Sequence, residues 1–349
     1  MSGGVDSSTT AALLVERGYR VIGMMMRLWS ESEEGDDRFV SNRCCSPEAV
    51  ADARGVCQTL GIPFYLLNFE AAFKQHVVDF FVDGYARGTT PNPCLECNRE
   101  VKLGALLVKA RALGADHLAT GHYARVRQDR GLFQLLKGVD PNKDQSYALH
   151  VLNQEQLTHA VFPLGEHTKD ETRAMARRFG LRVADKHESQ DLCFIADGDY
   201  RHFLQRRIPS LLVPGDIVDA RGEVLGRHQG LAFYTIGQRK GLGIAAGQPL
   251  YVIALDTARN TLVVGRADEL GRQELVAGGV NWISGSPPDG EIEVTAKIRY
   301  RAAEVPAAVT PLAAGRARVV FHLPLRDITP GQAVVFYQDE LCLGGGRIQ

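Results

Sequence analysis

The residues at the start of the chain have the types and spacing of a phosphate-binding turn. The turn consists of Ser2, Gly3, Gly4, Val5, Asp6, Ser7 and Ser8. Adjacent glycines permit backbone conformations that other residues avoid, and we expect Asp6, Ser7 and Ser8 to cap the helix that follows. Unpaired N–H groups, the helix dipole and the serine hydroxyls together suit phosphate or pyrophosphate, although the turn lacks the lysine of the mononucleotide P-loop. The competing interpretation is a plain Gly-rich turn that only begins a helix.

Three cysteines also lie where they could do chemistry. Cys94 and Cys97 are separated by two residues in a proline-rich loop, directly before an expected helix over residues 98–113. The dipole of that helix would favour their thiolates. Cys193 follows a polar stretch, residues 189–191, and no local packing pattern explains it. Inert core cysteines, a zinc site and sulfur chemistry all remain open. Zinc is disfavoured because only two thiolates lie close in sequence, whereas a structural site usually has four ligands.

The remaining cysteines carry weaker signals. Cys57 and Cys342 are expected to be packing residues, and the adjacent Cys44 and Cys45 are a minor candidate for sulfur or metal handling. The chain has seven cysteines, an odd number with irregular spacing and no secretory segment ahead of them, which favours the reducing cytoplasm. No apolar run reaches membrane-spanning length, so we expect no membrane partner. The formal net charge of -1 means that any RNA contact must come from local basic patches.

The elements that would position these residues alternate between strands and helices. Ser46 and Pro47 begin one helix that Gly61 ends, and a capping box of Thr168 and Glu171 begins another that runs to residue 180. The alternation predicts a parallel sheet with ligands at the carboxyl ends of its strands, so Gly121 and His122 would face the nucleotide. Further helices are expected at 7–17, 70–85 and 98–113, and strands at 19–26, 64–68 and 116–123.

The pattern changes in the second half of the 349-residue chain. From residue 214 onward, short alternating apolar runs recur between turns, as in antiparallel sheets or small barrels. We therefore predict an α/β nucleotide-binding domain over residues 1–200, a small mixed or β domain over 201–275 and an antiparallel β-barrel over 276–349. A buried strand usually precedes a turn such as residues 2–8, so we also expect Met1 to be an internal methionine of a longer protein.

These motifs resemble those of known enzymes. Residues 2–8 resemble the PP-loop of the N-type ATP pyrophosphatases, which split ATP to AMP and pyrophosphate while they adenylate a carbonyl oxygen. With other motifs they resemble, from the first residue to the last, the tRNA-specific 2-thiouridylase family. The other motifs are residues 90–98, 119–124, 142–147, 193–195, 228–230, 235–243, 297–301, 329–332 and 342–346.

The resemblance implies a reaction in two steps. ATP would lie on residues 2–8 with Met26 and Gly121 at the adenosine, and the 2-oxygen of the wobble uridine would attack the α-phosphate. Cys193 would carry a persulfide, and Cys97 would attack it and leave a Cys97 to Cys193 disulfide to be reduced each turnover. Asp6 would help to hold Mg²⁺ on the departing pyrophosphate.

The resemblance also implies RNA contacts and a protein partner. The wobble base would leave its stack to reach the nucleotide, and a sulfur-donor protein of the cysteine desulfurase relay would load the persulfide. Simple solvation is the alternative for such polar side chains. The implied contacts are Asn92, Pro93 and Cys94 on the target base, His122 beside it, and Lys143, Asp144, Gln145, Arg299, Tyr300 and Gln332 on the rest of the tRNA.

One departure from the family pattern leaves a second route open. Many members have an aspartate where this chain has Cys94, so Cys94, Cys97 and Cys193 could hold a four-iron four-sulfur cluster whose unique iron carries the sulfur. The persulfide route is what the resemblance most directly implies. Two other classes of function compete: a PP-loop ligase or amidase acting on small molecules, which would need neither Cys97 nor Cys193, and an RNA-binding module that retains only the nucleotide fold.

Overall fold

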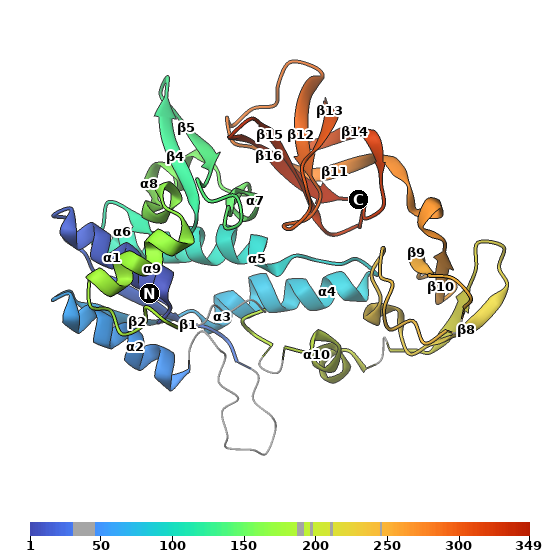
Figure 1. Ribbon diagram of the computed structural model, residues 1–349, viewed down its shortest axis with the longest axis horizontal. Helices are drawn as coiled ribbons and strands as arrows, with labels where there is room; N and C mark the ends of the chain where they lie inside the picture. The colour runs from blue at the N-terminus through green and yellow to red at the C-terminus, as the bar shows by residue number, and fades with distance from the viewer. Residues whose placement is uncertain (31–45, 187–191, 196–197, 210–211, 245) are drawn as a thin grey trace.

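A computed structural model describes the chain except for residues 31–45, 187–191, 196–197, 210–211 and 245. An α/β part, blue to green in Figure 1, leads through α10 to a small sheet and then to a β-barrel drawn in orange and red. Cys44, Cys45 and the polar stretch before Cys193 (189–191) lie outside the described residues.

Parallel strand pairs form the centre of the α/β part. β1 (Gly23–Arg27) pairs in parallel with β2 (Phe64–Asn68), and β3 (Leu118–Ala119) pairs in parallel with β6 (Ala160–Val161). In the described part of the chain these are two separate two-stranded sheets. The expected parallel arrangement is therefore confirmed, although β3 covers only two of the eight residues expected for that strand.

Two long helices carry π-helical turns in their middles. One runs through α3 (Glu70–Phe73), η1 (Lys74–Asp79) and α4 (Phe80–Ala86), as expected. The other runs through α5 (Pro93–Glu96), η2 (Cys97–Ala105) and α6 (Leu106–Ala112), so it begins five residues before the predicted start at 98. The reason is local: the Asn92 side chain accepts a hydrogen bond from the Cys94 N–H, and Pro93 occupies the first helical position. Cys94 and Cys97 thus lie inside the helix.

Of the other helices, α1, α2 and α9 form where the sequence predicts them, whereas α7, α8 and α10 were not predicted. Ser46 caps α2 (Pro47–Thr59), and the capping box of Thr168 and Glu171 begins α9 as predicted. The remaining helices are α1 (Val5–Glu16), α7 (Ser146–Leu149), α8 (Gln154–His159), α9 (Lys169–Arg178) and α10 (Tyr200–Arg207), with 3₁₀ turns η3 (Pro163–Glu166), η5 (Leu231–Phe233) and η6 (Ala267–Leu270). Among the residues described, no helix is both long and apolar enough to cross a membrane.

The second half of the chain is built from strands. A four-stranded sheet of order β8-β7-β10-β9 contains both parallel and antiparallel strand pairs. The prediction of a small mixed or β domain is thus confirmed. Six later strands close into the predicted antiparallel barrel, of order β11-β14-β13-β12-β15-β16, through a pairing of β11 with β16. The bounds are β7 Gly215–Val218, β8 Val224–His228, β9 Tyr251–Asp256, β10 Thr261–Gly265, β11 Arg272–Trp282, β12 Ile292–Lys297, β13 Val305–Leu312, β14 Arg316–Leu325, β15 Ala333–Gln338 and β16 Leu341–Ile348. β11 spans the boundary at 275/276 that we placed from the sequence.

The barrel and the α/β part are joined directly. A hairpin of β4 (Ala124–Asp129) and β5 (Leu132–Lys137), which the sequence did not suggest, extends the barrel sheet through pairing of β5 with β16. One hydrophobic core runs across the junction and includes Leu135 of the hairpin and Tyr337 of the barrel. The barrel is therefore positioned against the elements that carry the site.

Candidate functional site

The Gly-rich turn forms an open helix start. Gly4 is the N-cap of α1 and contributes no side chain, so the expectation that Asp6, Ser7 and Ser8 cap the helix is wrong. Instead, the hydroxyls of Ser7 and Ser8 donate to the Gly4 carbonyl oxygen at 3.3 Å and 2.8 Å. Gly3 has φ +69°, and a Cβ atom there would lie 2.5 Å from the Ala49 carbonyl oxygen, so this position requires glycine. With no side-chain cap on the first N–H groups of α1, the turn suits an anionic ligand.

The rest of the turn is anchored at both ends. Ser2 is exposed, and its hydroxyl lies 3.0 Å from the Ser7 hydroxyl. Val5, the first residue of α1, is buried, and its carbonyl oxygen accepts a hydrogen bond from the Thr9 hydroxyl. Hydroxyl groups therefore hold the turn in shape on either side of Gly3 and Gly4.

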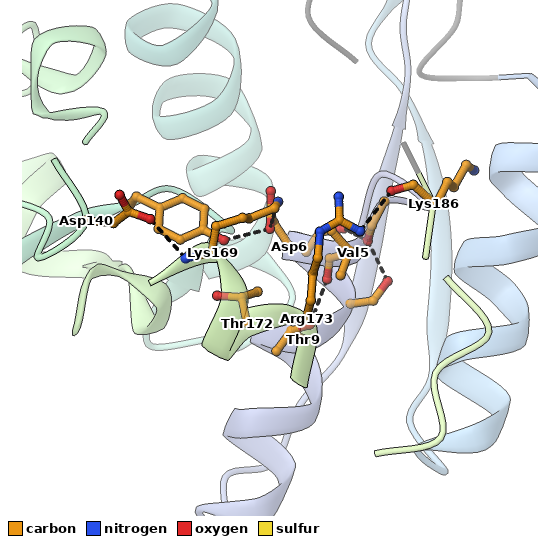
Figure 2. Close-up of polar contacts among 12 residues, drawn as sticks. Val5, Asp6, Thr9, Asp140, Lys169, Thr172, Arg173 and Lys186 are labelled. Atoms are coloured by element: carbon orange, nitrogen blue, oxygen red, sulfur yellow. Dashed lines mark hydrogen bonds and ion pairs between the residues drawn. The ribbon is translucent and has the colours of Figure 1, made fainter. Parts of the chain in front are cut away.

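The Asp6 carboxylate is held by two distant residues. Its Oδ1 accepts a hydrogen bond from Lys169 Nζ at 2.7 Å, as Figure 2 shows, and a second one from the Tyr123 hydroxyl at 2.9 Å. The Lys169 side chain is only 10% exposed and that of Asp6 is 31% exposed. Asp140 fixes the start of α9 by accepting the Lys169 backbone N–H at 3.0 Å. The lysine that the turn itself lacks is thus supplied from the first position of α9.

A second lysine reaches the turn from further along the chain. Lys186 Nζ donates to the Gly3 carbonyl oxygen at 3.0 Å and pairs with Asp52 Oδ2 at 2.7 Å. Two ammonium groups therefore border the turn, although neither belongs to a local motif. Lys169, Lys186 and Tyr123 were not predicted from the sequence as site residues; the available signal was that Tyr123 directly follows Gly121 and His122.

Gly121 and His122 lie at the end of β3, next to the turn. A Cβ atom on Gly121 would lie 2.9 Å from atoms of Asp6 and from the Ser7 nitrogen, so the two backbones are in close contact. His122 is buried, with its Nδ1 2.7 Å from the Thr120 hydroxyl. Burial, and then the positive charge of Lys102, lowers the pKa of His122 well below its usual value. The imidazole is therefore neutral at physiological pH.

Three predicted site residues flank one hydrophobic core. Cys97 is a buried member of the core, and the half-buried Met26 and Cys193 pack against it. Phe194, next to Cys193, contacts the rings of Phe73, Phe81 and Phe203 edge-on. The segment that carries Cys193 is thus anchored against α3, α4 and α10, in the core to which Cys97 belongs.

The three cysteines are not arranged as a metal site. Cys94 is exposed on the first turn of its helix, whereas Cys97 is buried one turn later. Within the described ranges, no group of three or more His, Cys, Asp or Glu side chains lies close enough to hold a metal ion. The cluster hypothesis for Cys94, Cys97 and Cys193 therefore does not fit the arrangement seen here, and we derive no step from it.

The predicted RNA-contacting residues of the α/β part lie at the starts of two helices, α5 and α7. Asn92 caps α5 and the buried Pro93 follows it, while Lys143 stands half-buried in the turn before α7. The Asp144 carboxylate accepts hydrogen bonds from the Gly138 N–H and from the N–H and hydroxyl of Ser146. Gln145 Oε1 accepts a hydrogen bond from the Tyr123 N–H. The Asp144 and Gln145 side chains thus stabilise the start of α7 and join it to Gly138 and Tyr123, at the two ends of the β4 and β5 hairpin.

The predicted contacts in the barrel lie at a junction. Arg299 donates to the Ile236 carbonyl oxygen at 3.0 Å and to the Thr329 hydroxyl at 2.6 Å. Gln332 donates to the Thr90 carbonyl oxygen at 2.8 Å, and Tyr300, which is 38% exposed, packs edge-on against Tyr147. Arg299 and Gln332 therefore join parts of the chain, whereas Tyr300 presents an aromatic surface to solvent.

Comparisons with known families cover nearly all of the chain. Residues 1–197 match the family described as the tRNA methyl transferase HUP domain, and residues 201–266 match the tRNA methyl transferase PRC-barrel domain. Residues 272–348 match the aminomethyltransferase β-barrel domain. These three matches agree with the α/β part, the small sheet and the barrel described above.

Similar proteins align over full length. The tRNA-specific 2-thiouridylases MnmA of Moorella thermoacetica and Magnetococcus marinus are each 54% identical, over 100% of this chain and 98% and 97% of theirs. That of Clostridium perfringens is 48% identical over 100% of this chain and 97% of its own. Among solved structures, an NMN synthetase from Francisella tularensis matches with a TM-score of 0.31 at 14% identity over 60% of this chain and 74% of that one, too weakly to carry an argument. The full-length similarity shows that this chain belongs to the tRNA-specific 2-thiouridylase family.

Proposed function

We propose that this protein catalyses the ATP-dependent 2-thiolation of the wobble uridine in tRNA. The observation that carries the proposal is 54% identity over the whole chain to enzymes named tRNA-specific 2-thiouridylases. The open helix start at Gly3 and Gly4 supports it, because adenylation of a base requires a site for the phosphates of ATP. A reducing cytoplasm, as the cysteine usage suggests, would be the compartment of the reaction.

In the adenylation step, ATP would lie with its phosphates on residues 2–8. The first N–H groups of α1 would bind phosphate oxygens, and Lys169 and Lys186 would offset their negative charge. The adenosine would lie near Met26 and Gly121, and the glycine lets its loop pack directly against Asp6 and Ser7 of the turn. The 2-oxygen of the uridine would attack the α-phosphate and release pyrophosphate, which turns that oxygen into part of an AMP leaving group.

Mg²⁺ fits this scheme because the protein would need to supply few of its ligands. Mg²⁺ bound to nucleotide phosphates needs only one or two protein carboxylates, and Asp6 is a partly exposed carboxylate beside the turn. Asp6 would hold the ion, which would neutralise charge on the departing pyrophosphate.

In the sulfur step, two cysteines would act in sequence. A donor protein of the cysteine desulfurase relay would leave a persulfide on Cys193. The Cys97 thiolate would attack the Cys193 sulfur, break the S–S bond of the persulfide, and free the outer sulfur to displace AMP from the base. A Cys97 to Cys193 disulfide would remain, and a cellular thiol would reduce it. Cys97 is a buried member of the hydrophobic core against which Cys193 packs, and this shared core supports the pairing.

The RNA would approach across the starts of α5 and α7 and across the barrel. Asn92, Pro93 and Cys94 would meet the flipped base, with His122 beside it as a neutral group. Lys143, Asp144, Gln145, Arg299, Tyr300 and Gln332 would contact the tRNA, and the exposed ring of Tyr300 is the best suited to stacking.

Cysteine variants separate the two steps. We expect Cys97→Ser and Cys193→Ser to retain tRNA-dependent release of pyrophosphate from ATP and to lose formation of 2-thiouridine. Cys94 is exposed and lies outside the two-thiol scheme, so Cys94→Ser should still release pyrophosphate and form 2-thiouridine, with any loss confined to the KM for tRNA. Pyrophosphate would be measured enzymatically, and nucleosides of the digested tRNA by mass spectrometry.

Other outcomes would redirect the proposal. Loss of 2-thiouridine in Cys94→Ser, together with bound iron in anaerobically purified protein, would replace the two-thiol route by the three-thiol one. Unchanged thiolation in both Cys97→Ser and Cys193→Ser would refute the sulfur step as written.

A further inference from the structure

The barrel contacts both ends of residues 89–97, which we call the cysteine segment because it runs from Thr89 to Cys97. This segment carries the candidate base-contacting residues and the candidate attacking thiolate. At either end, its polar groups bond to side chains or backbone of the C-terminal barrel.

The first contact is at Thr90. Its N–H donates to the Pro330 carbonyl oxygen at 2.9 Å, and its carbonyl oxygen accepts from Gln332 Nε2 at 2.8 Å. A Cβ atom on Gly331 would lie 2.9 Å from the Thr90 nitrogen, so the two backbones touch. The Thr90 hydroxyl also lies 3.3 Å from that of Thr235, in the small sheet domain. The α/β part, the small sheet domain and the barrel therefore meet at Thr90, which precedes Cys94 and Cys97 in the chain.

The second contact is at Glu96, which directly precedes Cys97. The Glu96 side chain is only 10% exposed and lies between two guanidinium groups. Arg99, on the same helix, donates to Oε2 at 2.6 Å, and Arg347 of β16 donates to Oε1 at 2.9 Å. Arg347 also lies over the ring of Phe80 in α4, 4.7 Å from its centroid. The ion pair thus links the last strand of the barrel to the turn that bears Cys97.

We propose that Arg347 is a positioning residue: by holding the Glu96 carboxylate, it fixes the position of the neighbouring Cys97 thiol relative to the barrel. A buried carboxylate with two charge-assisted partners is restrained far more than one with a single local partner. Arg99 moves with the helix, so among the residues that the structure describes it is Arg347 that fixes the Glu96 carboxylate relative to the barrel. Docking of tRNA on the barrel would thereby be coupled to the geometry of the thiolate. The catalytic importance of Cys97 rests on the proposed function; the restraint itself does not.

The test compares Arg347→Met with a matched control in the same barrel. Arg318→Met removes an arginine that pairs with Glu274 between β14 and β11, at 2.7 Å and 2.9 Å, away from the cysteine segment. Alkylation of Cys97 by a small thiol reagent, followed by peptide mass spectrometry, reports local opening. We expect Arg347→Met to speed alkylation of Cys97 about fivefold to thirtyfold, and Arg318→Met to leave it unchanged. The buried Cys57 serves as an internal reference for global unfolding.

Kinetics and a conservative variant complete the test. In the thiolation assay, Arg347→Met should lower kcat with little change in the KM for ATP, and Arg347→Lys should recover part of both the rate and the protection of Cys97. If Arg347→Met folds poorly, Glu96→Gln, which retains the shape of the side chain, should give the same selective exposure of Cys97. Equal alkylation of Cys97 in wild type, Arg347→Met and Glu96→Gln would overturn the proposal. Because alkylation requires neither ATP nor tRNA, this result is independent of whether the protein thiolates RNA.

Discussion

Replacing Lys169 by methionine should damage both the fold and the use of ATP. The variant keeps the length and apolar stem of the side chain but removes an ammonium 2.7 Å from Asp6 Oδ1. A hydrogen bond to a charged group contributes about 1.5–3 kcal/mol, and the lower part of this range applies because Asp6 is partly solvated. The loss leaves an uncompensated carboxylate facing the phosphates of ATP. If about 1.5–2 kcal/mol of this interaction acts in the transition state, kcat/KM for ATP falls about tenfold to thirtyfold.

A matched control is available on the same two helices. Arg178 of α9 pairs with Glu16 of α1 at 2.9 Å, but at the far end of α1, where both side chains are about half exposed. Arg178→Met should cost less than about 1 kcal/mol and leave ATP kinetics unchanged. Thermal unfolding gives the stabilities, and tRNA-dependent pyrophosphate release gives the kinetics. Equal effects of Lys169→Met and Arg178→Met would refute the assignment of Lys169 to the phosphate site.

Three further outcomes follow from the packing and the titration of buried groups. Gly121→Ala should lower stability by about 1–3 kcal/mol and weaken ATP binding, because the new Cβ would lie 2.9 Å from Asp6 atoms; Gly55→Ala, in open space on α2, should instead add up to about 1 kcal/mol. Ser46→Ala should cost about 1 kcal/mol in thermal or denaturant unfolding, since it removes the cap of α2. Burial lowers the pKa of His150 from its usual 6.5 to about 4, so the unfolded chain binds a proton in that window that the folded chain does not, and stability falls as the pH drops. Denaturant unfolding of His150→Gln should therefore show about 2 kcal/mol less loss between about pH 7 and about pH 5 than wild type, and an identical loss would contradict the assignment.

Local signals in the sequence predicted much of the fold. The cap and proline at Ser46 and Pro47, the capping box at Thr168 and the strand Phe64–Asn68 lie where expected, because each depends on a few neighbouring residues. The early start of the helix at Pro93 could also have been read from the adjacent Asn92. Alternating apolar runs predicted that the last part of the chain is an antiparallel barrel, without giving each of its strands.

Contacts between distant residues could not be predicted in this way. Lys169 reaches Asp6 across 163 residues and Lys186 reaches Gly3 across 183, and no periodicity links either pair. The pairing of β5 with β16 likewise depends on how the barrel docks. The turn at residues 2–8 thus revealed the location of the site, while its electrostatics required the three-dimensional structure.

The most direct test of the account is the mass of the wobble nucleoside. Unmodified tRNA would be incubated with the protein, ATP, magnesium and a persulfide donor, then digested and analysed by mass spectrometry, with ATP omitted in a parallel sample. The account predicts replacement of one oxygen by one sulfur in the wobble uridine, only with ATP and not with Cys193→Ser. Unaltered uridine in the complete reaction with the wild-type protein, despite folded enzyme and a loaded donor, would contradict it.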